Sequence, residues 1–318
     1  MDLLFLVAGL ALLVTGGEAL VRGAVGLARR FEISPMIVGL TLVGFGTSTP
    51  ELVTSLQAAL AGSPGIALGN VVGSNIANIL LIIGLAALVR PLEVERAALR
   101  RDGAVLAVVS VLCLFMVLGE SVGRLAGACC LLLLALYLAA TLWLERRRAT
   151  AAGDLYRAEA ASLPAAPGGP VSAALMLAGL VLTVIGARLL VTGAVGLAAA
   201  MGLSETAIGL TIVAIGTSAP ELVTSLMAAR RGESGVAFGN VIGSNIFNVL
   251  GILGATALVH PLAVPPEIAQ VHIWVMLAAT AALLLFAATA GRITRPEAAL
   301  LCAAYIGYTA ALLLAAAA

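Results

Sequence analysis

The sequence of 318 residues is poor in charge. Only 10% of its residues are charged, it contains no lysine, and only three residues are aspartate. A soluble globular protein has about 25% charged residues. Here 62% of the residues are hydrophobic and the mean hydropathy is +1.14. The composition therefore excludes a soluble enzyme, a nucleic-acid-binding protein and a disordered chain, and it indicates a protein with several membrane spans.

Cysteine and histidine are also scarce. The four cysteines, Cys113, Cys129, Cys130 and Cys302, lie in apolar runs and show no spacing that suggests a metal site or a disulfide framework. All three aspartates lie outside the apolar runs, and no histidine stands at the centre of a run beside a nucleophile. These absences disfavour an intramembrane enzyme, and we expect neither a bound cofactor nor a nucleic-acid partner.

The rest of the chain consists of long apolar runs. Most have the roughly 20 residues that a helix needs to cross about 30 Å of hydrocarbon. They are continuous rather than alternating, which excludes a membrane β-barrel. The sequence thus predicts an all-α polytopic protein of the lipid bilayer with ten transmembrane helices. The expected spans are residues 3–28, 34–60, 67–89, 103–119, 125–144, 171–199, 204–229, 237–259, 268–290 and 297–317.

The arginines predict the orientation, because the cytoplasmic connections of membrane proteins are rich in basic residues. The odd-numbered connections between the expected spans contain fourteen arginines, whereas the even-numbered connections contain only Arg124. We therefore expect the odd connections in the cytoplasm and both termini outside, with the protein in the cell (inner) membrane.

The two halves of the chain repeat each other. Residue n matches residue n+170, with 36 identities in the 59 positions from Ser34 to Leu92. Shared apolar composition does not explain matched Thr, Ser, Pro, Glu and Asn at one fixed offset. The strongest blocks are GTSTPELVTSL at 46–56 against GTSAPELVTSL at 216–226, and GNVVGSNIANIL at 69–80 against GNVIGSNIFNVL at 239–250.

The repeat predicts the domain organisation. We expect a first five-helix repeat at residues 1–144, a short, flexible cytoplasmic linker at 145–170, and a second five-helix repeat at 171–318. Because each repeat has an odd number of spans, equivalent helices run in opposite directions and the topology is inverted. Inverted repeats build secondary transporters, in which the substrate lies near the bilayer midplane between the repeats.

Glu51 and Glu221 are equivalent and stand near the middle of their spans. An acidic residue there costs about 3 kcal/mol on insertion scales, so it is a functional candidate. Pro50 and Pro220 precede them and each removes a backbone donor. We expect each helix to open around GTSxPE and to present carbonyl, hydroxyl and carboxylate oxygens, a set that suits a hard cation such as Ca²⁺. The alternative is a kink that carries a protonated structural glutamate.

Asn78 and Asn248 stand near the centres of the third and eighth expected spans. Ser74 and Ser244 come one turn earlier, so each Ser–Asn pair shares a helix face. The amide and hydroxyl oxygens are neutral cation ligands. The alternative is a hydrogen bond between helices, which is a common role of Asn and Ser in membranes.

Other polar residues of the spans have structural interpretations. Glu18 and Arg22 are four residues apart and are expected to form an ion pair, and Arg188 aligns with Glu18 in the second half. Packing or helix capping is the expected role of four further asparagines: Asn70, Asn75, Asn240 and Asn245.

The motif pairs GTSTPEL with GSNIAN and GTSAPEL with GSNIFN resemble the paired alpha-repeats of the calcium/cation antiporter superfamily, and within it the prokaryotic sodium/calcium exchangers. The resemblance covers nearly the whole chain. It implies ten helices, with four core helices carrying the ions and the first and sixth helices sliding across them. It also implies Ca²⁺ and Na⁺ as transported ions. The ligands that it implies are the carboxylates of Glu51 and Glu221, the hydroxyl or carbonyl oxygens of Thr47, Ser48, Thr217 and Ser218, the carbonyls of Gly44 and Ala214, and the side chains of Ser74, Asn78, Ser244 and Asn248.

One position departs from the family pattern. Well-studied sodium/calcium exchangers often have Asp where this chain has Asn248, and an asparagine does not ionise. The two glutamates still balance one Ca²⁺. The missing ionisable group bears on the number of sodium ions per cycle and on sodium coupling itself.

We therefore predict a secondary antiporter that exchanges Ca²⁺ for Na⁺ by alternating access. A Ca²⁺/H⁺ antiporter with the same ligands is the nearest alternative, because buried glutamates also carry protons. A cation channel is less favoured, since inverted repeats around one site do not form the continuous pore that a channel needs. The sequence does not predict an oligomeric state.

Overall fold

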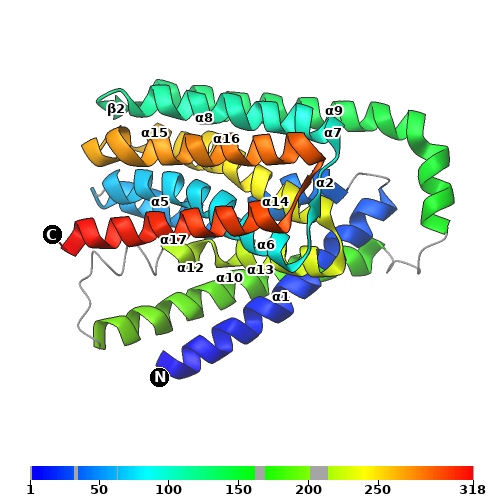
Figure 1. Cartoon of the computed structure of the whole chain (residues 1–318), viewed down its shortest axis with the longest axis horizontal. Helices are drawn as coiled ribbons and strands as arrows, with labels where there is room; N and C mark the ends of the chain where they lie inside the picture. Colours follow the sequence, from blue (N-terminus) through cyan, green and yellow to red (C-terminus); the bar gives the residue numbers. More distant parts are fainter. Residues whose placement is uncertain (1, 32–34, 63, 162–168, 201–213, 318) are drawn as a thin grey trace.

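The computed structural model describes residues 2–31, 35–62, 64–161, 169–200 and 214–317. Across these residues the chain is a helical bundle with two short antiparallel ribbons (Figure 1). Continuous apolar sequence favours helices because a helix satisfies its own backbone groups without water. Among the described residues, six helices are long and apolar enough to cross a membrane: Val7–Leu27, Pro64–Val89, Arg124–Leu144, Gly169–Gly186, Ser234–Val259 and Ile268–Ala290. The helical class is as predicted.

Two long helices form the interior of the bundle. In the most apolar stretch of each helix, 78% is buried for Pro64–Val89 and 83% for Ser234–Val259. The corresponding share is 28% for Arg124–Leu144 and 22% for Gly169–Gly186. Each interior helix changes from α to π geometry at an asparagine. The first consists of α5 (Pro64–Ala77), η2 (Asn78–Ile83) and α6 (Gly84–Val89), and the second of α14 (Ser234–Phe247), η5 (Asn248–Leu253) and α15 (Gly254–Val259).

Two interrupted helices pack against this interior, and each is broken at a serine. Ser48 (φ −79°, ψ 8°) and Ser218 (φ −83°, ψ 7°) leave the helical conformation, as the GTSxPE motif predicted. Residues 204–213 of the predicted span 204–229 lie outside the described residues. The first interrupted helix consists of α2 (Pro35–Val38), η1 (Gly39–Val43), α3 (Gly44–Thr47) and α4 (Thr49–Leu60), and the second includes α12 (Ala214–Thr217) and α13 (Ala219–Arg231).

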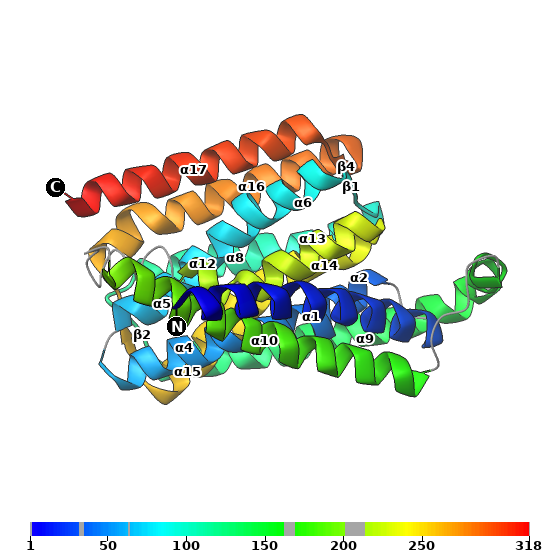
Figure 2. The same cartoon turned by 90° about the horizontal axis from the view of Figure 1, so that it is seen from below.

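The helices α1 (Asp2–Arg30) and α10 (Gly169–Ala200) lie side by side along one flank, as both views show (Figures 1 and 2). Glycines allow this close approach. A Cβ on Gly179 would stand 2.3 Å from the backbone nitrogen of Leu20, and one on Gly23 would stand 2.3 Å from that of Met176. Small residues of this kind let membrane helices pack backbone to backbone.

The remaining helices surround the interior pair and are joined by two ribbons at opposite ends of the bundle (Figure 2). β1 (Leu92–Glu93) pairs antiparallel with β4 (Arg292–Ile293), and β2 (Ser121–Val122) pairs in the same way with β3 (Leu262–Ala263). Each ribbon therefore takes one strand from each half of the chain. The surrounding helices are α7 (Arg96–Ala98), η3 (Leu99–Gly103), α8 (Ala104–Val117), α9 (Arg124–Ala161), η6 (Ile268–His272), α16 (Ile273–Ala290) and α17 (Arg295–Ala317).

The expected linker at 145–170 differs in part from the structure. Helix α9 continues to Ala161, so the first part of this segment is helical, and α10 begins at Gly169. The sequence that follows Leu144 is rich in Ala, Arg and Glu, which are good helix formers. Residues 162–168 lie outside the described residues.

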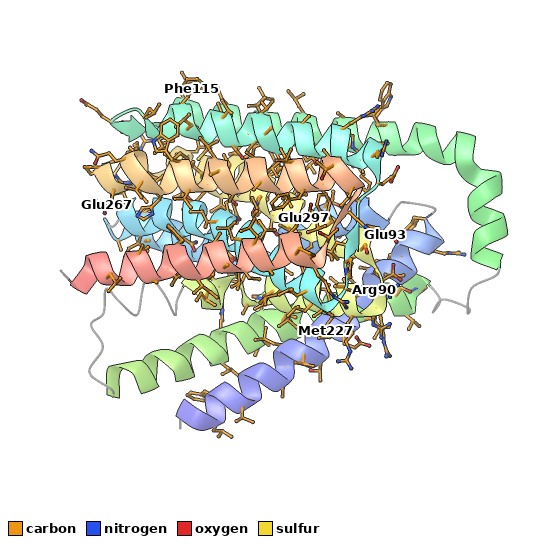
Figure 3. The ribbon with its side chains drawn as sticks, viewed as in Figure 1. Arg90, Glu93, Phe115, Met227, Glu267 and Glu297 are labelled. Atoms are coloured by element: carbon orange, nitrogen blue, oxygen red, sulfur yellow. The ribbon has the colours of Figure 1, made fainter. Side chains whose placement is uncertain are left out.

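Arginines from several connections meet at one end of the bundle. A Cβ on Gly232 would stand 2.6 Å from Nη1 of Arg90, and Nε of Arg295 donates to the carbonyl of Leu88 at 3.2 Å. Arg90 and Glu93 lie at this end, and Glu267 lies at the opposite end (Figure 3). These arginine-rich connections therefore lie at the same end of the bundle.

The close contact of α1 with α10 predicts that Gly179→Ala destabilises the protein. The added methyl group meets the backbone of α1, which cannot move without separating the helices, and overpacking of this kind costs about 1–3 kcal/mol. Thermal unfolding in detergent should show a lower midpoint. The matched control is Gly307→Ala in α17, where, apart from the surrounding turns of the same helix, no heavy atom of the described residues lies within 4 Å of the added Cβ. Equal midpoints for the two variants would contradict the prediction.

Candidate cation site

Glu51 and Glu221 lie at equivalent places, in the first turn of α4 and of α13, directly after the break in each helix. Pro50 and Pro220 occupy the start of these helices, where the missing N–H of proline costs no hydrogen bond. The glutamate side chains are almost fully buried, at 2% and 1% exposure. The first turn of a helix carries partial positive charge, which favours a carboxylate at this position.

Each carboxylate is bound by the other half of the chain. Ser48 Oγ donates to Oε1 of Glu221 at 2.8 Å, and Ser218 Oγ donates to Oε1 of Glu51 at 3.0 Å. The serine that breaks one helix thus binds the glutamate that follows the break in the other helix. This exchange brings the two carboxylates into one site between the halves.

Four oxygens of this site have no hydrogen-bond partner among the described residues. A buried polar atom without a partner costs about 1–3 kcal/mol, and more when it is charged. Four such acceptors in two equivalent pairs form a set of oxygens of the kind that a cation binds. The four atoms are Oε2 of Glu51, Oε2 of Glu221, Oδ1 of Asn78 and Oδ1 of Asn248.

The amide nitrogens of the two central asparagines are bound by two other asparagines. Asn78 Nδ2 donates to Oδ1 of Asn245, and Asn248 Nδ2 donates to Oδ1 of Asn75, both at 2.9 Å. Both bonds cross between the interior helices. They occupy the nitrogen of each amide and leave its oxygen available.

Asn70 and Asn240 connect the interior helices to the interrupted helices. Asn70 Nδ2 donates to the carbonyl of Glu51 at 3.1 Å and to Ser55 Oγ at 2.9 Å. Asn240 makes the equivalent bonds to the carbonyl of the second glutamate at 3.2 Å and to Ser225 Oγ at 2.9 Å. Of the two expected roles, packing or capping, capping is excluded for this pair, because both residues lie well inside α5 and α14 and not at their ends. Their bonds to the interrupted helices fit the packing role.

Thr47 and Thr217 are buried in the last turn before each break. Thr47 Oγ1 lies 3.3 Å from Oδ1 of Asn240, and Thr217 Oγ1 lies 3.4 Å from Oδ1 of Asn70. The two hydroxyls therefore lie next to the asparagines that bind the glutamate backbone, and the nearest acceptor of the Thr47 hydroxyl is the carbonyl of Val43, at 3.0 Å. They lie beside the site and are already hydrogen-bonded.

Ser74 and Ser244 are buried but differ in their contacts. Ser74 Oγ lies 3.5 Å from Oδ1 of Asn70, whereas Ser244 Oγ donates to the carbonyl of Gly44 at 3.1 Å. The Gly44 carbonyl also accepts from the hydroxyl of Thr47 and the backbone N–H that follows it, both at 3.2 Å. To bind an ion it would have to exchange these donors. Ala214 begins α12.

The charged residues of the first span are paired, as the sequence predicted. Arg22 Nε donates to Oε1 of Glu18 at 2.9 Å. The sequence did not predict that Arg231, at the end of α13, also binds Glu18. This second ion pair connects α1 to an interrupted helix. Arg188 is exposed on α10.

Sequence reasoning missed the role of Asn75 and Asn245. Both were expected to pack or cap, yet each binds the amide of a central asparagine on the opposite helix. One signal was available, because all six asparagines of the chain lie in the GNxxGSNxxN segments of the two repeats. A residue type restricted to two equivalent motifs favours a shared function over separate caps.

Comparison with known proteins agrees with this geometry. The chain matches the family described as sodium/calcium exchanger protein over residues 1–144 and 171–314. It is 39% identical to the inner membrane protein YrbG of Escherichia coli (strain K12) over 262 residues, which cover 82% of this chain and 81% of that protein. It is 35% identical to the sodium/calcium exchanger MaX1 of Methanosarcina acetivorans over 339 residues, which cover 96% and 97%. A solved structure of the sodium-calcium exchanger NCX_Mj, soaked with Na⁺ and Ca²⁺, superposes with a TM-score of 0.85 at 33% identity over 98% of both chains.

Asn70 and Asn240 each donate two hydrogen bonds, and the equivalence of these bonds predicts that losing either asparagine lowers stability by a similar amount. Asn70→Leu and Asn240→Leu each remove two hydrogen bonds that the amide donates, one to a buried carbonyl and one to a buried hydroxyl, so each should destabilise the fold by about 1–3 kcal/mol. The thermal unfolding midpoint in detergent measures this. Gln57→Leu, on the exposed face of α4, is the control for exchanging an amide for leucine. The prediction is contradicted if the two asparagine variants unfold at the midpoint of the control.

Proposed function

The chain belongs to the sodium/calcium exchanger family, and we propose that it exchanges Ca²⁺ for Na⁺ across the membrane by alternating access. Family membership makes it a cation antiporter of the membrane and not an enzyme. The observation that supports the proposal most strongly is the set of four unpartnered oxygens on Glu51, Glu221, Asn78 and Asn248. Two of these side chains are carboxylates, so their charge balances one divalent cation.

The proposed ligands fall into two groups. The four unpartnered oxygens bind the ion directly, because they have no hydrogen bond to the part of the chain that the structure describes. The other groups become ligands only by exchanging bonds that they make in this structure or by acting through their carbonyls. This second group consists of Thr47, Ser48, Ser74, Thr217, Ser218, Ser244 and the carbonyls of Gly44 and Ala214.

The mechanism follows from the charge of the site. Ca²⁺ and Na⁺ compete for the same two carboxylates, so one load must leave before the other binds. Either load neutralises the site, whereas two bare carboxylates are expensive to enclose in an apolar bundle. Only the loaded site therefore changes its access, which couples the two fluxes and suppresses leak. The movement is that of α1 and α10, which contact each other through glycines and lie outside the buried interior pair.

We also propose the ten-helix arrangement of two inverted repeats. Its support is the correspondence of contacts at the fixed offset, such as the serine–glutamate and asparagine–asparagine bonds. The ribbons support it too, since β1 and β3 are equivalent strands at opposite ends of the bundle. We assign the arginine-rich end, with Arg90 and Glu93, to the cytoplasm of a bacterial-type inner membrane.

The second candidate is a Ca²⁺/H⁺ antiporter with the same ligands. One observation favours it, because Asn248 limits the site to two ionisable groups where related exchangers often have a third. Two glutamates that release Ca²⁺ can each take a proton. The two candidates have the same binding site and differ only in whether the flux of Na⁺ or of H⁺ is coupled to that of Ca²⁺.

The proposal predicts calcium transport in proteoliposomes that depends on both glutamates. Vesicles loaded with Na⁺ should accumulate ⁴⁵Ca²⁺ when diluted into sodium-free buffer. Glu51→Gln and Glu221→Gln should each reduce this flux to background, because an amide keeps the shape but removes the charge that balances Ca²⁺. Glu267→Gln, at an exposed position near one end of the bundle, is the matched control and should transport normally.

Two results would change the assignment. Flux near the wild-type rate in both glutamine variants at the site would contradict the proposed ligands. Calcium flux that follows an imposed pH gradient and is indifferent to Na⁺ would instead establish the proton-coupled candidate.

The proposed orientation predicts which positions a membrane-impermeant maleimide reaches. In a variant without the four native cysteines, Glu267→Cys should be labelled in intact cells. Glu93→Cys should be labelled only after the membrane is opened. Both glutamates are exposed and lie at opposite ends of the bundle, so each serves as the control for the other. The reverse pattern would show that the termini face the cytoplasm.

A further inference from the structure

We propose that Asn75 and Asn245 are positioning residues, which turn the amides of Asn248 and Asn78 so that oxygen and not nitrogen faces the transported cation. The inference rests on the proposed function, because it concerns how the same site is kept attractive to cations. The observation is the pair of 2.9 Å bonds from Nδ2 of the two central asparagines to Oδ1 of their partners.

Orientation matters because an amide has two different ends. Its oxygen accepts hydrogen bonds or binds a cation, and its NH₂ group donates and repels a cation. A carboxylate has no such problem, since both of its oxygens are equivalent. With Asn at both central positions, this chain needs a device that fixes the rotation of each amide, and a bound acceptor on the nitrogen provides it.

The hold on Asn248 is the firmer of the two. Asn75 Nδ2 faces two acceptors, the carbonyl of Asn245 at 3.4 Å and the sulfur of Met276 at 3.6 Å. Neither of these atoms can donate, so Asn75 keeps its nitrogen toward them and its oxygen toward Asn248. A flip of the Asn248 amide would then place two oxygens against each other.

The hold on Asn78 depends on a single bond. Asn245 is fully buried, and its Nδ2 has no hydrogen-bond partner among the described residues. If the amides of Asn78 and Asn245 both turned over, the bond between them would be remade with donor and acceptor exchanged. The cation itself is then the group that favours the oxygen-inward state of Asn78. The two halves of the site are therefore unequal in rigidity, although their sequences match.

The test is a double-mutant cycle on Ca²⁺ binding to the purified full-length protein, measured by titration calorimetry. Asn75→Leu removes the acceptor and keeps a similar volume. In the wild-type background it should weaken Ca²⁺ binding by about 10–100-fold, the usual effect of losing a residue that orients a metal ligand. In the Asn248→Asp background the loss should be under about threefold, because a carboxylate presents an oxygen in either rotation.

A second measurement reads the orientation without any ion. The chain has only six asparagines, so selective ¹⁵N-asparagine labelling gives six carboxamide groups. The pair of resonances that disappears in Asn248→Asp belongs to Asn248. In Asn75→Leu these resonances should shift and exchange faster with solvent deuterium, because their hydrogen bond is lost.

The outcomes separate this inference from the proposed function. Equal losses of Ca²⁺ affinity in both backgrounds would mean that Asn75 is only structural. The inference would also be overturned by an unchanged Ca²⁺ affinity in both backgrounds, or by unchanged Asn248 resonances in Asn75→Leu. Failure of the proposed function looks different. In that case calcium binding does not depend on the carboxylates, so the wild-type protein and the Glu51→Gln and Glu221→Gln variants do not differ in it. The resonances of Asn248 still report whether Asn75 holds its amide.

Discussion

Glu51 and Glu221 are buried at the centre of an apolar bundle, and each carboxylate receives one hydrogen bond from the serine that breaks the opposite helix. Burying a carboxylate is expensive unless donors or a cation compensate it. Much of the local structure supplies that compensation. The serines at the breaks in the two helices donate to the carboxylates. The first turns of α4 and α13 place positive helix ends beside the charges, and one oxygen of each carboxylate is left for an ion.

The polar groups around this centre form layers with different tasks. The central asparagines present oxygens to the site, a second pair of asparagines binds their nitrogens, and a third pair ties the interior helices to the backbone of the two glutamates. The hydrogen bonds of these six asparagines thus connect four helices, in one cluster of four asparagines and two separate links to the interrupted helices. Because the bonds are buried among apolar residues, the loss of one partner leaves a buried polar group that is costly.

The sequence was sufficient to predict the helical membrane class, the repeat, the helix breaks and the two buried glutamates, because all of these depend on composition or on one fixed spacing. Contacts between elements were not predictable in the same way. Spacing places Ser48 and Glu51 near one another on a helix, but it does not show that the serine binds Glu221 instead. The partner of Asn75 and the second partner of Glu18, Arg231, were missed for the same reason, since each lies on a different helix. The helical extension of α9 was missed because the segment that follows it, residues 162–170, is rich in Gly and Pro and suggested a loop.

The two ribbons have a consequence for how the protein is made. Each ribbon pairs a strand of the first half with a strand of the second, and the first half emerges from the ribosome before β3 and β4 exist. Until then β1 and β2 have no partner strand, and Glu51 lacks the hydroxyl of Ser218. Before the second half is inserted, the first half therefore lacks one hydrogen bond of the Glu51 side chain. Its final structure is completed only when the second half has been inserted, so the protein reaches its cation-binding form late in biogenesis.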